Sequence, residues 1–181
     1  MRPLLAVGVL AAVATLSAAC SSSGGGAGAT GPGATFDVGQ LEAWCGSVCD
    51  RAVGCDARID KPTCVNQCKN ANAAAAAHAR ADYMQGYLDC ARSTDCATLL
   101  AGPTACADRS RAALAPTTAV QSFCDALIQK QADCKNTQVT PTRCLDSVKV
   151  VDDGSVGQAR DCLGKACADY QACVLAAVGA K

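Results

Sequence analysis

Cysteine is the residue type with which this chain could do chemistry, because it occurs 15 times in 181 residues. A thiolate can bind a soft metal ion or act as a nucleophile, and two thiols can form a disulfide. The sequence contains no C-x-x-C, the spacing typical of redox dithiols and of zinc knuckles. It contains C-x-x-x-C twice, at Cys45/Cys49 and at Cys64/Cys68. Residues four apart lie on one face of a helix, so each pair places two sulfur atoms side by side.

Other residues that could be catalytic lack a supporting pattern. The single histidine, His78, lies in AAAAAHARA without an obvious partner to orient it, so we interpret it as a surface residue. We interpret Asp152-Asp153 as a solvated turn and the stretch from Asp108 to Arg111 as a charged helix face. The sequence has no H-E-x-x-H, G-x-S-x-G or glycine-rich phosphate loop. We therefore expect no catalytic residue, no cofactor and no metal site.

The net charge indicates nothing about a charged partner. Sixteen acidic residues balance sixteen basic residues, and no basic stripe suggests a nucleic-acid surface. We expect no nucleic-acid partner.

The first nineteen residues have the layout of a secretory signal peptide. Arg2 supplies a positive start, and an uncharged apolar run extends from Leu4 to Leu16. This run is shorter than the roughly 20 apolar residues that a membrane-spanning helix needs. We therefore predict that residues 1–19 are a cleaved signal peptide.

The stretch LSAAC, which ends at Cys20, resembles the lipobox of bacterial lipoproteins. Its leucine lies four residues before the cysteine, where that family has it three before. The resemblance implies that Cys20 becomes the first residue of the mature chain and carries a lipid with acyl chains such as palmitate. Ser21, in place of an aspartate, implies anchoring at the outer membrane of the bacterial cell envelope.

The number of cysteines supports a special role for Cys20. Fifteen cysteines would leave one unpaired thiol in an exported protein, whereas fourteen without Cys20 form an even set. Residues 21–35 contain only Ser, Gly, Ala, Thr and Pro, a composition that cannot form a packed core. We predict that residues 20–35 form a flexible linker, which reaches about 20 Å from the membrane.

The remaining chain contains two similar segments. LEAWCGSVCDRAVGC, from Leu41, aligns with VQSFCDALIQKQADC, from Val120, and both have the apolar spacing of an amphipathic helix. Each segment is followed by a proline and a cysteine, which indicates the start of a second helix. We predict an all-α fold of two divergent disulfide-stapled helical-hairpin repeats, residues 36–117 and 118–181. The alanine-rich residues 69–81 should extend the second helix, and Gly86 should interrupt the helix that follows.

The alignment also suggests disulfide partners. Cys49 and Cys68 face Ile128 and Val148 in the second half, and a lost disulfide would remove two cysteines together. We therefore predict a bond between Cys49 and Cys68. The remaining cysteines align in this order: Cys45 with Cys124, Cys55 with Cys134, Cys64 with Cys144, Cys90 with Cys162, Cys96 with Cys167, and Cys106 with Cys173.

A turn near residue 58 would place Cys55 opposite Cys64, and the alignment then pairs Cys134 with Cys144. The alternative ladder, Cys45–Cys68 with Cys49–Cys64, resembles the twin C-x-x-x-C helical hairpins of other small proteins and stays open. The spacing leaves unassigned the partners of Cys45, Cys90, Cys96, Cys106, Cys124, Cys162, Cys167 and Cys173.

Two functions remain after these exclusions. The C-x-x-x-C spacing also resembles that of bacterial copper-storage four-helix bundles, which implies Cu(I) or Zn(II) sequestration by thiolates as an alternative. Exported cysteines in even number favour disulfides, and the second half keeps neither C-x-x-x-C. We therefore expect a non-catalytic, membrane-anchored lipoprotein whose helical domain binds a partner such as a protein or displays a stable surface.

Overall fold

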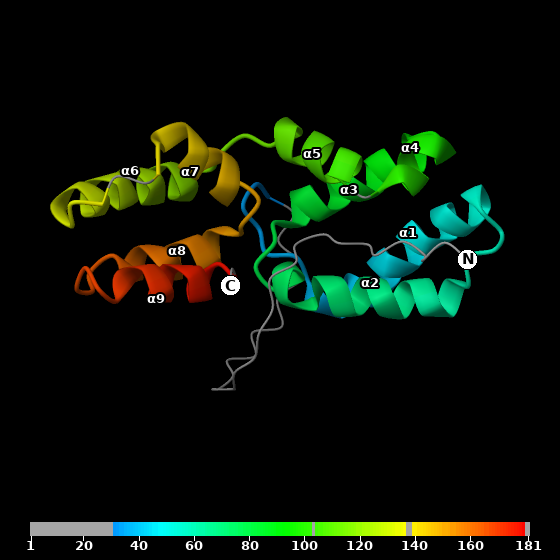
Figure 1. The fold of residues 1–181 in the computed structure, drawn as a ribbon, viewed down its shortest axis with the longest axis horizontal. Coiled ribbons are helices and arrows are strands. Elements are labelled where there is room, and N and C mark those ends of the chain that lie inside the picture. Colours follow the sequence, from blue (N-terminus) through cyan, green and yellow to red (C-terminus); the bar gives the residue numbers. More distant parts are fainter. Residues whose placement is uncertain (1–30, 103, 137–138, 180–181) are drawn as a thin grey trace.

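The computed structural model describes residues 31–102, 104–136 and 139–179, and these ranges fold into helices (Figure 1). The all-α prediction is confirmed. The predicted signal peptide, the lipidation site Cys20 and residues 21–30 of the predicted linker lie outside the described residues. No helix in the described ranges is both long enough and apolar enough to cross a bilayer.

The first half of the described chain begins with the 3-10 turn Val38–Gln40. It continues with α1 (Leu41–Cys55), α2 (Lys61–Ala76), α3 (Ala81–Ser93), α4 (Cys96–Ala101) and α5 (Thr104–Ala113). Helix α1 packs against α2 and α3, and α5 packs against α3.

The second half comprises α6 (Thr118–Asp133), α7 (Pro141–Val148), α8 (Asp153–Cys162) and α9 (Tyr170–Ala177). Helix α6 packs against α7 and α8, and α9 packs against α8. In Figure 1 these helices lie beside the first half, and α9 ends near the carboxyl end of α2.

Proline and a capping side chain start the second helix of each half. The Asp60 side chain accepts a hydrogen bond from the Thr63 amide at the start of α2, and the Thr140 side chain caps α7 in the same way. Each helix has a proline in its first turn, where the missing amide hydrogen is not needed. The alanine-rich stretch extends α2 to Ala76, as predicted, because alanine loses no side-chain entropy in a helix.

Gly86 does not interrupt a helix, contrary to the prediction. Helix α3 continues through it, and a Cβ atom at this position would lie 2.8 Å from the Ser110 hydroxyl oxygen. That hydroxyl donates a 2.7 Å hydrogen bond to the Tyr83 carbonyl oxygen. The glycine therefore lets α5 approach α3 closely.

The two halves have separate hydrophobic cores. The first includes Trp44, Tyr83 and Tyr87 from α1 and α3, and the second includes Phe123 and Tyr170 from α6 and α9. Each core contains few aromatic side chains, so neither is large. Val150, in the connection between α7 and α8, is partly buried and packs against both clusters.

Three short backbone segments meet where the two halves join. The Phe36 amide donates to the Ala79 carbonyl oxygen (2.8 Å), and the Arg80 amide donates to the Val150 carbonyl oxygen (2.9 Å). Thr35 forms an isolated β-bridge with Arg80, and its hydroxyl donates to Asp152. The predicted linker therefore ends earlier than expected, because its last residues belong to this junction.

Asp152 is buried at the junction, so the prediction of a solvated turn there is wrong. Its Oδ1 accepts hydrogen bonds from the amides of Gly154 and Ser155 at the start of α8. An N-cap carboxylate satisfies amides that the first helical turn leaves unpaired.

Arg80 is the most deeply buried basic side chain of the junction, at 2% exposure. One terminal nitrogen donates 2.9 Å hydrogen bonds to the carbonyl oxygens of Ala115 and Lys149. Its Nε and its other terminal nitrogen each donate a hydrogen bond to one carboxylate oxygen of Asp82. The guanidinium thus links α3 to the segment that enters the second half and to the connection between α7 and α8.

Candidate functional site

All fourteen cysteines within the described ranges form disulfides, and every bond lies within one half. The bonds are Cys45–Cys68, Cys49–Cys64, Cys55–Cys96 and Cys90–Cys106 in the first half, and Cys124–Cys144, Cys134–Cys167 and Cys162–Cys173 in the second. The alternative ladder of the α1–α2 hairpin is therefore the observed one.

The predicted Cys49–Cys68 bond is wrong because the hairpin turns earlier than residue 58. The two observed bonds between α1 and α2 share a midpoint between Asp56 and Ala57. With the turn at that point, each C-x-x-x-C faces the other in register, and Cys49 lies opposite Cys64.

The predicted Cys55–Cys64 and Cys134–Cys144 bonds are also wrong. Cys55 is the last residue of α1 and bonds to Cys96, the first residue of α4. Cys134 lies just after α6 and bonds to Cys167, while Cys144 bonds to Cys124. In both halves, a cysteine at the end of the first helix reaches beyond the hairpin.

The disulfides of the second half match three of the first half in order: the hairpin bond, the bond from the end of the first helix, and the bond from the third helix to the last helix. Cys49–Cys64 has no counterpart. The absence of this one bond from the second half accounts for the two additional cysteines of the first half. These two cysteines are Cys49 and Cys64, and not Cys49 and Cys68 as predicted. The sequence alignment of the two halves, in which the prolines match, made Cys144 the counterpart of Cys64. The disulfides make Cys144 the counterpart of Cys68.

Disulfide formation removes the ligands that the metal alternative requires. A cysteine binds Cu(I) or Zn(II) as a thiolate, and each of the fourteen sulfur atoms is bonded to another sulfur atom. Among the described residues, no three His, Cys, Asp or Glu side chains are grouped so that they could hold a metal ion. Thiolate sequestration would therefore require prior reduction of the protein.

His78 is half-buried and connects the halves, so it is not the surface residue that the sequence indicated. Its Nδ1 lies 2.8 Å from the hydroxyl oxygen of Ser155 in α8. A Ser-His catalytic pair normally has a third group that orients the imidazole. Among the described residues no carboxylate forms a hydrogen bond with His78, and Asp152 instead accepts from the Ser155 amide.

A cavity of about 430 Å³ lies between the two halves. Its wall includes Ala71 and Ala75 from α2, Tyr87 from α3, Phe123 from α6 and Val174 from α9. Pockets for small molecules commonly measure about 300–1,000 Å³ and have mostly apolar walls. Because alanine side chains are single methyl groups, the face of α2 cannot fill the space between the two cores.

The charged groups on the cavity wall have one sign. Arg111 from α5 and Arg143 from α7 line it, and no aspartate or glutamate of the described ranges does. Arg111 is half-buried, and its Nε is buried without a hydrogen-bond partner among the described residues. Arg143 is exposed.

The titration of Tyr83 reflects both the apolar wall and this cation. Burial raises the pKa of the Tyr83 hydroxyl, and the nearby charge of Arg111 lowers it by a smaller amount. Burial also raises the pKa of Tyr87 to about 12. Both tyrosines line the cavity and carry neutral hydroxyl groups at physiological pH.

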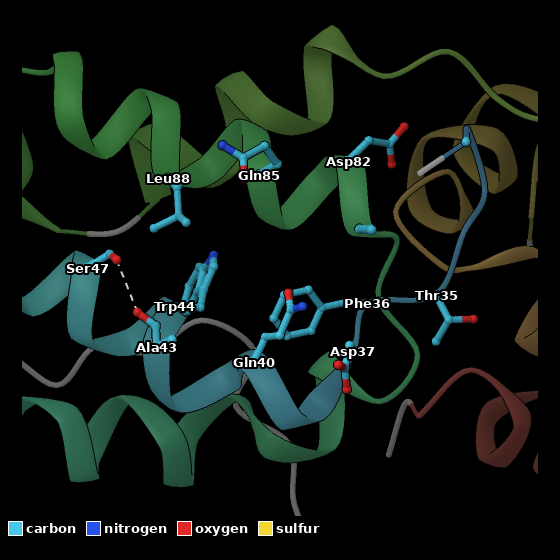
Figure 2. A pocket seen from close by; sticks show the side chains of 12 residues that line it. Thr35, Phe36, Asp37, Gln40, Ala43, Trp44, Ser47, Asp82, Gln85 and Leu88 are labelled. Atoms are coloured by element: carbon cyan, nitrogen blue, oxygen red, sulfur yellow. Dashed lines mark hydrogen bonds between the residues drawn. The ribbon is translucent and has the colours of Figure 1, made fainter. Parts of the chain in front are cut away.

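Figure 2 shows a second hollow, of about 670 Å³, between α1 and α3. Trp44 forms part of both hollows and donates a 2.9 Å hydrogen bond from Nε1 to the Met84 carbonyl oxygen. The two acids of this hollow already have partners, because Asp37 accepts from the Gly39 amide and Asp82 binds Arg80. The cavity between the halves, which is lined by an arginine without an acidic partner, is therefore the better candidate site.

The sequence did not reveal this site. Arg111 belongs to the stretch that we interpreted as a charged helix face, and the alanines indicated only a helix. No local motif connects these residues, since they come from helices far apart in the chain. Arg111, a basic residue in the last turn of the alanine-rich helix α5, was the one available signal.

Comparison with known proteins found no match to a family model, to a curated protein or to a solved structure.

Proposed function

We propose that this chain is a non-catalytic lipoprotein of the bacterial cell envelope, anchored at the outer membrane through a lipid on Cys20, whose helical domain binds an apolar partner. The observation that carries the binding role is the cavity between the halves, with its walls of alanine, valine and aromatic side chains. Removal of such an apolar surface from water by a ligand lowers the free energy of the system.

The disulfides support a binding function outside the reducing cytoplasm. Disulfides persist in exported proteins and stabilise domains whose cores are small. They lie within each half, so they maintain the two cores without crossing the cavity. A ligand can therefore enter without breaking a covalent bond.

Two observations support the anchor. The apolar run and the LSAAC stretch resemble a lipoprotein signal. The fourteen cysteines after Cys20 are bonded to one another, so lipidation would account for the fifteenth. Labelling cells with an alkyne analogue of palmitate should mark the protein in the outer-membrane fraction, and Cys20→Ala should abolish the label. Equal labelling of both proteins would contradict lipidation at Cys20.

The binding role can be tested with the exported full chain carrying Cys20→Ala, which avoids competing detergent. The neutral apolar dye N-phenyl-1-naphthylamine should bind with increased fluorescence. Ala75→Phe fills the cavity wall from α2 and should abolish the increase. Ala73→Phe is the matched control, because Ala73 lies on the same helix, is exposed and does not line the cavity. The same fluorescence from both variants would refute binding in the cavity.

A further inference from the structure

We infer that the cavity binds an amphiphile with one long apolar chain and an anionic head, of which a long-chain fatty acid is the simplest example, and that Arg111 binds the head. This inference rests on the proposed function, because it names the class of ligand for the same cavity.

The unpartnered arginine gives the first argument. A buried polar group without a hydrogen-bond partner costs free energy, and a buried charge costs more. The Nε of Arg111 is buried without a partner in the described part of the chain, and this side chain forms no ion pair there. A carboxylate or phosphate in the cavity would supply the opposite charge that this guanidinium lacks. Such charge-assisted hydrogen bonds are stronger than neutral ones, and the planar guanidinium matches both anions.

The sign of the charge over the whole wall gives the second argument. Arg111 and Arg143 are its charged members, and no described acidic side chain lines the cavity to neutralise them. A cationic ligand would meet repulsion without compensation. An anionic head would be attracted from the rim, where Arg143 is exposed, toward Arg111 inside.

The remaining wall is mostly apolar and therefore favours an apolar body. Ala74 and Ala75 from α2, Leu127 from α6, and Val174 and Val178 in and after α9 are among its apolar residues. These side chains offer no hydrogen bond to a polar body such as a sugar or a peptide backbone. The volume of about 430 Å³ is that of a small-molecule site, much less than a folded partner would need.

Arg111, and not Arg143, should dominate the binding of the head. An exposed guanidinium is hydrated and screened by salt, so its ion pairs contribute little. Arg111 is half-buried and lines the cavity together with Tyr83, whose hydroxyl can donate to the same anion.

The test uses cis-parinaric acid, a fluorescent fatty acid, and the exported full chain with Cys20→Ala. Trp44 is the single tryptophan of the chain and lines the cavity, so energy transfer from it reports occupancy. Palmitic acid and its neutral analogue 1-hexadecanol then compete for the site. Palmitate should displace the probe at about tenfold lower concentration than hexadecanol, because one charge-assisted hydrogen bond distinguishes them.

Substitution of the arginine should remove this difference. Arg111→Met keeps most of the apolar stem and should weaken palmitate about tenfold while leaving hexadecanol unchanged. Arg111→Lys should recover part of the preference, and Arg143→Met should have a smaller effect. Near-UV circular dichroism of Trp44 checks that each variant folds.

The outcomes separate this inference from the proposed function. If palmitate and hexadecanol compete equally in the unsubstituted chain, the anionic head is refuted, and that comparison does not depend on the folding of a variant. Binding of N-phenyl-1-naphthylamine would still support an apolar ligand in that case. If neither this dye nor parinaric acid binds, both the inference and the proposed binding function fail.

Discussion

Replacement of Arg80 by methionine should lower the free energy of unfolding more than the same replacement of any other arginine in this chain. Methionine preserves most of the apolar stem but removes the guanidinium. Four hydrogen bonds disappear: two to Asp82 and one each to the carbonyl oxygens of Ala115 and Lys149.

The size of the expected loss in the free energy of unfolding depends on which former partners of the guanidinium stay buried. Breaking a buried ion pair by removing one partner costs about 3–5 kcal/mol, because the other groups lose their compensation. The Asp82 side chain is 37% exposed and can regain water, which places the loss near the lower limit, at about 3 kcal/mol. For a chain of this size, such a loss lowers the melting temperature by about 6–12 °C.

Scanning calorimetry and guanidinium denaturation, without reductant, measure this loss. Arg109→Met is the control, because Arg109 is exposed on α5, and its removal should change the free energy of unfolding by less than about 0.5 kcal/mol. If Arg80→Met costs no more than the control, the guanidinium does not hold the junction and the reasoning is refuted.

Three further outcomes follow from the structure. Cys124→Ala with Cys144→Ala opens the hairpin of α6 and α7, and denaturation should show a loss of about 3 kcal/mol; a loss near zero would mean that packing alone closes it. Gly86→Ala should lower stability by about 1 kcal/mol, although helix propensity alone predicts a gain of about 1 kcal/mol, because the new methyl group displaces a hydroxyl of α5. The hydrogen bond from Arg58 lowers the pKa of Asp56 to about 2, so NMR titration of Arg58→Gln should find it raised toward about 3.9. Since the folded-state pKa is the lower one, this stabilisation is present above about pH 4 and is lost as the pH falls toward 2, and an unchanged titration would contradict the contact.

Features that depend on neighbours in the sequence could be predicted. The periodicity from Leu41 and from Val120 identified α1 and α6, and the prolines marked the first turns of α2 and α7. These signals are local, because helix formation depends on residues within about four positions of each other.

Disulfide pairing could be predicted only in part. Both ladders of the α1–α2 hairpin place cysteines on facing helix surfaces, and they differ by a shift of a few residues in the turn. The position of that turn depends on how Asp56 and its neighbours end α1, and a mispredicted turn changed the partner of Cys49. The bond from Cys55 to α4 depends on the packing of α1 against a helix about forty residues later, for which no local signal exists.

The sequence by itself determined the helical class, the starts of α1, α2, α6 and α7, and the even set of cysteines after Cys20, since composition and short-range spacing decide these features. The tertiary structure alone decided which cysteines pair, where Arg80 is buried, and that Arg111 faces an apolar cavity. The physical reason is that burial and charge environment arise from contacts between residues far apart in the chain. The same arginine is a solvated charge on an isolated helix and becomes a candidate ligand-binding group when α2, α6 and α9 enclose the space beside it.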